Sequence, residues 1–258
     1  MPHAARSGTL LVVTLFAAAC GSKSTAVQPP LPKPDGPAPS VAKVDNPDGD
    51  FAFNFVATGF PAVTADGANV VFAVMDETGP MSAPNLKLSV RDRTDAEVHQ
   101  VVVLTAEQGN AYVTSDEPPP FDDQPLAEAN RYLAELHGQR GWFPIAEMTL
   151  DEPAEGQDES LMGMATAAHS GTVQLAWNEG TVKVTVDGKL VVDRTNPGWL
   201  ATPAPPPPDC DDCACSNPSY LNKAWLDPAR KLIIARIAYI GTDSCWEPAP
   251  QDHVIAWE

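Results

Sequence analysis

The 258-residue chain is acidic, with 16 Lys and Arg residues against 34 Asp and Glu residues and a formal net charge of −18 at pH 7. A surface this negative repels phosphate groups, so nucleic acid and anionic lipid surfaces are excluded as favoured partners. The length is sufficient for one folded domain with a substantial core.

The first nineteen residues have the order of a secretory signal. Arg6 lies in a short basic segment, an uncharged stretch runs from Thr9 to Phe16, and small residues follow. The stretch is too short for a permanent transmembrane helix, which needs about 20 apolar residues. We therefore expect residues 1–19 to be a signal peptide that is removed during export.

The residues around Cys20 carry a second signal. Three alanines, Ala17 to Ala19, precede Cys20, and Gly and Ser follow it. This segment resembles the lipobox of bacterial lipoproteins, although that family usually has leucine in the place of Ala17. The resemblance implies that Cys20 becomes the lipidated N-terminus and anchors the chain in a membrane of the bacterial cell envelope, facing the periplasm or at the outer membrane. The alternative is an ordinary A-x-A cleavage site and a soluble secreted protein.

Residues 20–50 predict a tether. From residue 22 on they are rich in Pro, Ser and Ala and contain few large apolar side chains, so they cannot bury enough surface to offset the entropy of ordering. A proline-rich segment is stiff and extends by roughly 3 Å per residue, which would hold a folded part clear of the lipid. We expect residues 51–258 to form a single β-rich domain.

Short apolar or alternating segments separated by Gly, Pro and Asp turns predict strands along this domain. These segments are residues 51–55, 69–74, 86–91, 98–104, 173–177, 181–186, 189–194, 231–240 and 253–257. Asp187 and Gly188 join two of them, and Asp-Gly between alternating segments is the strongest local signal of a β-hairpin. The fold predicted is mainly β, with antiparallel sheets in a sandwich or a partial propeller.

One stretch, near residues 124–137, has a helical period. Its apolar residues share one face of a helix, and they are Leu126, Ala129, Leu133 and Leu136. Asp122 and Asp123 are candidate N-terminal caps, and Gly138 is expected to end the helix. We therefore predict one α-helix inserted among the strands.

Residues 60–74 resemble the repeat of TolB-like β-propellers. In that repeat a Pro-x-x-Ser/Thr-x-Asp-Gly turn leads into an apolar strand, and here Pro61, Thr64 and Asp66 stand at those positions. The resemblance implies a propeller blade, but it covers only these residues. Similar turns at Asp187 and Asp227 follow after 121 and then 40 residues, whereas blades recur every ~40 to 45 residues.

Four cysteines besides Cys20 fall in or after a Pro- and Cys-rich insertion at residues 201–218. They are Cys210, Cys213, Cys215 and Cys245. In an exported chain an even number of cysteines favours disulfides, and closing a loop of roughly 30 residues contributes about 3 to 4 kcal/mol. A four-thiolate metal site and a redox-active pair at Cys210 and Cys213 are the alternatives. We expect disulfides, and neither a metal nor another cofactor.

The sequence contains no local signature of a hydrolase, metalloprotease or nucleotide site, so no catalytic residue is assigned. Four histidines follow the signal: His99, His137, His169 and His253. We interpret His99, His137 and His253 as surface or capping residues. His169 and Ser170 are neighbours, but adjacent residues on a strand point to opposite faces.

These observations predict a cell-envelope lipoprotein that acts as a binding or interaction module, with an envelope protein or a small ligand as its partner. One alternative is an envelope hydrolase assembled from distant residues, which would need His169 or His253 beside a serine and an acid in a cleft. Another is a structural or assembly component of the envelope.

Overall fold

The computed structural model describes residues 36–46, 52–75, 83–114, 117–151, 164–200, 218–240 and 249–258. All of them belong to one compact unit, Leu31–Glu258. Within these residues the chain is mainly antiparallel β with two α-helices, which confirms the predicted fold class. Cys20 and the four candidate disulfide cysteines lie outside the described residues.

The first five-stranded sheet, here called the N-terminal sheet, has the strand order β6-β5-β4-β3-β7. Its strands are β3 (Ala62–Thr64), β4 (Asn69–Val74), β5 (Leu86–Asp92), β6 (Glu97–Leu104) and β7 (Trp142–Pro144). The predicted strands at 69–74, 86–91 and 98–104 are confirmed. The segment that resembles a propeller repeat forms the β3–β4 hairpin of this sheet.

A four-stranded central sheet has the order β16-β15-β14-β8. Its strands are β8 (Ala146–Glu147), β14 (Ser219–Asp227), β15 (Leu232–Tyr239) and β16 (Gln251–Ala256). The last two strands correspond to the predicted segments 231–240 and 253–257.

A second five-stranded sheet, the outer sheet, has the order β13-β12-β11-β10-β9. Its strands are β9 (Thr149–Leu150), β10 (Ala167–Ser170), β11 (Val173–Asn178), β12 (Thr181–Val186) and β13 (Lys189–Thr195). The predicted hairpin is confirmed, because Val186 pairs with Lys189 and both turn residues have positive φ, 51° at Asp187 and 74° at Gly188. A short 3₁₀ helix, η2 (Pro197–Trp199), follows β13.

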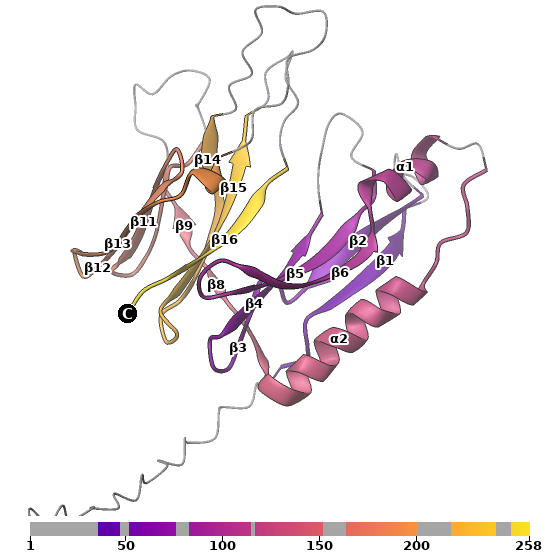
Figure 1. Ribbon diagram of the computed structural model, residues 1–258, viewed down its shortest axis with the longest axis horizontal. Coiled ribbons are helices and arrows are strands. Elements are labelled where there is room, and N and C mark those ends of the chain that lie inside the picture. Colours follow the sequence, from indigo (N-terminus) through magenta and orange to yellow (C-terminus); the bar gives the residue numbers. More distant parts are fainter. Residues whose placement is uncertain are drawn as a thin grey trace, which may run out of the picture. The chain divides into compact units, whose positions relative to one another are not determined.

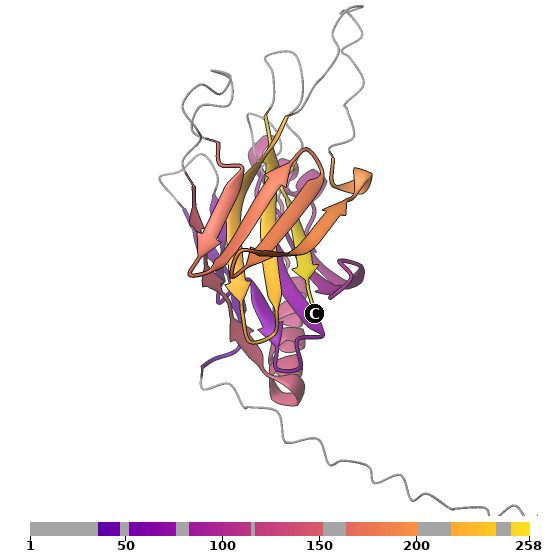
Figure 2. The ribbon, with the colours of Figure 1, turned by 90° about the vertical axis from the view of Figure 1, so that its left-hand side faces the viewer.

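The three sheets stack face to face, as a sandwich does, and the central sheet is buried on both faces (Figure 1). Along β15, Ile233 and Ile237 face the outer sheet, whereas Leu232 and Ile234 face the N-terminal sheet. Figure 2 shows the outer sheet in front of the central one. Strands buried on both faces are apolar at nearly every position, which is the pattern of β15.

The long helix α2 (Gln124–Arg140) covers the other face of the N-terminal sheet. Its predicted apolar face is confirmed, since Ala129 and Leu133 are buried in the core cluster there. Gly138 was predicted to end the helix, but the helix continues to Arg140. Gly141 then adopts a φ of 71°, and its N–H donates to the carbonyl of His137. No helix among the described residues is long and apolar enough to cross a membrane.

A two-stranded hairpin lies beside α2 and consists of β1 (Ser40–Asp45) and β2 (Phe53–Thr58). Part of the segment predicted as a tether is therefore a strand. Val41 is buried, and its backbone N–H and C=O bind the side-chain amide of Asn130 on α2 at 3.0 and 2.8 Å. The helix thus binds the outer edge of β1. A prediction from residue propensities does not detect this contact.

The shorter helix α1 (Ala106–Thr114) was not predicted. It begins with a reciprocal cap, in which the Gln108 N–H donates to the Thr105 hydroxyl and the Thr105 N–H donates to the Gln108 side-chain oxygen. The spacing Thr-x-x-Gln is a known signal of a helix start. Gly109 lets the helix lie against the backbone of Pro84, because a Cβ at this position would be 2.1 Å from the Pro84 oxygen.

Candidate functional site

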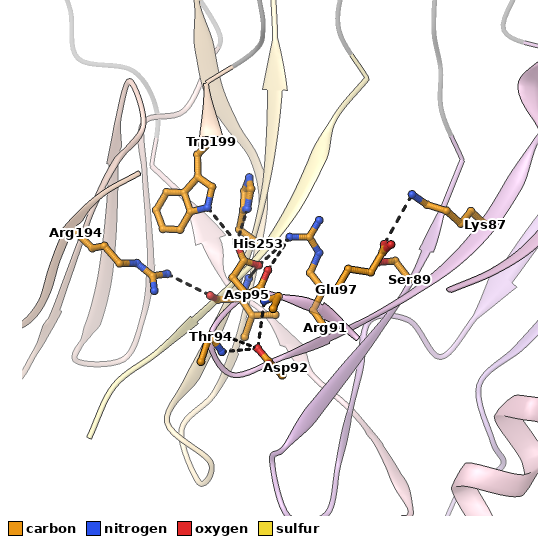
Figure 3. Close-up of polar contacts among 12 residues, drawn as sticks. Lys87, Ser89, Arg91, Asp92, Thr94, Asp95, Glu97, Arg194, Trp199 and His253 are labelled. Carbon is orange, nitrogen blue, oxygen red and sulfur yellow. Dashed lines mark hydrogen bonds and ion pairs between the residues drawn. The ribbon is translucent and has the colours of Figure 1, made fainter. Parts of the chain in front are cut away.

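The main polar cluster between the sheets is centred on Asp95 (Figure 3). Asp95 lies in the turn between β5 and β6, where it adopts a φ of 72°. The Asp92 carboxylate shapes this turn by accepting hydrogen bonds from the N–H groups of Thr94 and Ala96 at 2.7 and 3.2 Å. An aspartate that binds the backbone two residues later is typical of such turns, and Asp tolerates positive φ better than most residues do.

The carboxylate of Asp95 accepts hydrogen bonds from three parts of the chain. Nδ1 of His253 and Nε1 of Trp199 lie 2.8 and 3.0 Å from Oδ2. The N–H of Val254 and Nη1 of Arg91 lie 2.7 and 3.1 Å from Oδ1. Because an ionised carboxylate only accepts hydrogen bonds, Nδ1 of His253 carries the proton of this contact.

Burial of the Asp95 carboxyl favours its neutral form and by itself raises its pKa. The hydrogen bond and the charge of His253, the Val254 N–H and the charge of Arg91 together outweigh burial, so the pKa of Asp95 lies below its ordinary value. The side chain of Asp95 is 7% exposed and that of His253 is 4% exposed. Asp95 is therefore a buried, ionised group.

The cluster binds the free edge of the central sheet. β16 is an edge strand, and Val254 directs its N–H to Asp95 and its C=O to Nη2 of Arg194 at 3.3 Å. Asp95 comes from the N-terminal sheet and Arg194 from β13 of the outer sheet. Two side chains thus take the place of a further strand and connect all three sheets.

Aromatic packing fixes the same cluster. Trp199 is buried between Arg194, whose guanidinium carbon lies 4.6 Å from the indole centroid, and the ring of His253 at 5.0 Å. The Tyr239 hydroxyl donates to the carbonyl of Trp199 at 3.0 Å, and burial raises the pKa of Tyr239 to about 12, so it remains a donor. Trp199 is therefore a core residue.

The four histidines separate into different roles. His253 is 3% exposed, so its prediction as a surface or capping residue was wrong; the partner that buries it, Asp95, is 158 positions away in the sequence. His137 follows the prediction, since its ring accepts the N–H of Trp142 at the end of α2. His99 is exposed on β6 and stacks on Tyr132, and His169 is exposed beside Asp151.

Within the described residues the side-chain partners of His253 and His169 are acids, Asp95 and Asp151, and no serine hydroxyl binds either ring. Nε2 of His253 is buried and has no hydrogen-bond partner within the described part of the chain. His169 has Asp151 as a partner, but its side chain is 48% exposed on the outer sheet. Among the described residues no group of three or more His, Cys, Asp or Glu side chains could hold a metal ion.

The second candidate is a recess of about 250 Å³ formed by the end of β6, helix α1 and the segment before α2. Its lining is mostly apolar and consists of Val103, Leu104, Gln108, Ala111, Tyr112, Pro119, Phe121, Asp122 and Pro125. Concave apolar surfaces with a few polar groups are the usual form of binding sites. Sequence reasoning did not find this recess, because α1 and the proline segment meet only in the folded chain.

Comparisons of the chain with models of protein families, with curated proteins and with solved structures find no match. The role of both candidate sites therefore has to be argued from their own chemistry.

Proposed function

We propose that this chain is a lipid-anchored binding module of the bacterial cell envelope, which recognises its partner through the recess beside α1. The proposal combines the lipobox-like segment at Cys20, the proline-rich segment that follows it, and the apolar concavity of the folded part. In this proposal the anchor lies in the outer membrane or faces the periplasm.

The observation that carries the proposal is the contrast between the two candidate sites. The Asp95 cluster has its carboxylate saturated with donors and its histidine buried, so a substrate could reach it only after the sheets separate. The recess, in contrast, opens at the surface and is lined by aromatic and proline rings. Large rigid rings supply much of the binding energy at protein interfaces.

Site-specific photocross-linking in the source bacterium tests this function. A photoreactive phenylalanine analogue would replace Ala111 or Pro119 in the recess, and Ala176 on the exposed face of β11 is the matched control. We expect both recess positions to give the same adduct and the control position to give none. Adducts of equal yield from all three positions, or none from the recess, would refute the proposal.

A further inference from the structure

We infer that the recess binds an extended, proline-containing peptide segment that carries a lysine or arginine. This inference rests on the proposed function and names the class of its partner. The volume of the recess, about 250 Å³, is below the roughly 300–1,000 Å³ of sites that enclose a small-molecule ligand. It therefore suits a few side chains of a longer ligand, the rest of which stays on the surface.

The lining favours proline rings. Tyr112 and Phe121 lie with ring centroids 6.4 Å apart, and Pro119 and Pro125 complete the same wall. Extended proline-rich peptides dock on surfaces of this composition, because their rings pack on aromatic faces and their backbone is already extended before binding. An amphipathic helix would instead need a longer groove with anchors at helical spacing.

The aromatic wall is held in place before any ligand arrives. Phe53 packs edge-on against Tyr112 and Phe121, with ring centroids 5.0 and 5.1 Å apart. The Tyr112 hydroxyl also donates to the carbonyl of Pro120 at 3.4 Å. Because these side chains are already ordered, peptide binding costs little additional conformational entropy. Even a short peptide can therefore bind measurably.

The rim of the recess selects the charge of the peptide. Asp122 lines the recess, and the exposed residues Asp123 and Glu107 adjoin the lining residues Asp122 and Gln108 in the sequence. Lys43 lies over the ring of Phe121, but its amino group is ion-paired with Asp45. On a chain with a net charge of −18, this rim favours a cationic partner and disfavours an acidic one.

The test uses the full mature chain and three synthetic peptides of equal length, with the sequences PPRPP, PPEPP and GSRGS. Binding is followed by ¹⁵N amide shifts, with the amides of Ala111 and Gln108 as reporters of the recess. We expect saturable shifts at these amides with PPRPP, and binding at least about tenfold weaker with either of the other peptides. Equal affinity for PPEPP or GSRGS, or shifts elsewhere on the fold, would overturn the inference.

A charge-reversal variant tests the rim. Asp123 makes no side-chain capping bond to α2, so Asp123→Lys removes no hydrogen bond from the helix start. We expect it to weaken PPRPP binding by about fivefold, whereas Asp193→Lys on the exposed face of β13 changes nothing. No effect of Asp123→Lys would contradict the assigned role of the rim.

The cross-linking experiment separates failure of this inference from failure of the proposed function. If the recess positions cross-link to an envelope partner but PPRPP does not bind, the function stands and the partner class is wrong. If neither occurs, both are wrong. A cross-link from Ala111 to a proline-rich stretch of the same chain would also overturn the inference, because the recess would then be occupied internally.

Discussion

Side chains bind the free edge of two strands in this protein, at places where a neighbouring strand would otherwise be. Asn130 binds both backbone groups of Val41 on β1, and Asp95 and Arg194 together bind those of Val254 on β16. An open edge is a site of unwanted pairing with other chains. These contacts therefore contribute to specificity of assembly as well as to stability.

Asp95→Asn is expected to lower the free energy of unfolding by about 2–4 kcal/mol at pH 7. An asparagine keeps the size and tolerates the positive φ, but its amide presents a donor to groups that themselves donate. Denaturant unfolding measures the change. Asp193→Asn, in an exposed ion pair at 3.9 Å, is the control and should change stability by less than about 0.5 kcal/mol.

The contribution of Asp95 to the free energy of unfolding should also depend on pH. The pKa of Asp95 is lower in the folded protein than in the unfolded chain, where an Asp side chain has a pKa of about 3.9. The stabilisation is therefore fully present above the unfolded pKa and is lost as the pH falls through the folded pKa. The stability difference between wild type and Asp95→Asn should shrink between pH 7 and pH 3. A difference that stays constant would show that the carboxylate charge is not its source.

At the scale of elements, two helical glycines have opposite surroundings. A Cβ at Gly109 of α1 would lie 2.1 Å from the Pro84 oxygen, whereas nothing lies within 4 Å of a Cβ at Gly138 of α2. We expect Gly109→Ala to destabilise by about 1–3 kcal/mol, because α1 must move away from Pro84. Gly138→Ala should stabilise by about 0.5–1 kcal/mol through helix propensity. Thermal unfolding compares the pair, and changes of the same sign would contradict this packing.

The contact between α2 and β1 can be tested separately. Asn130→Asp keeps an acceptor for the Val41 N–H but turns a carboxylate oxygen toward the Val41 carbonyl. We expect a loss of about 1–2 kcal/mol and faster hydrogen exchange along β1. Exchange in β11 and β12, which belong to the outer sheet and pack in a different core cluster from α2 and β1, is the internal control. If exchange rises equally in all of these strands, the contact does not act locally.

At the scale of the whole molecule, local patterns were predictable and long-range contacts were not. The bounds of β4 and β12 match the apolar segments in the sequence, because each has a continuous or alternating pattern. Strand β14 was missed because its register shifts between Leu221 and Lys223, which breaks the period of two. No local pattern pairs Asp95 with His253 across 158 residues.

The recess shows the same limit. Thr105 and Gln108 carried a readable helix-start signal, so α1 was within reach of sequence reasoning. That α1 would meet Phe121 and Pro125 depends on how α2 packs on the N-terminal sheet. The start signal of α1 could therefore be read from the sequence, although α1 was not predicted, whereas the recess itself could not.

Anchoring of the whole molecule is tested by Cys20→Ala. If Cys20 carries two or more acyl chains, wild type stays with the membrane after a high-salt wash, because such anchors do not depend on surface charge. The variant should move to the soluble fraction and lose the acyl mass in intact-protein mass spectrometry. Cys245→Ser, which removes a cysteine elsewhere, should stay with the membrane. Wild type in the soluble fraction would instead support the secreted alternative, in which Ala17-x-Ala19 is an ordinary cleavage site.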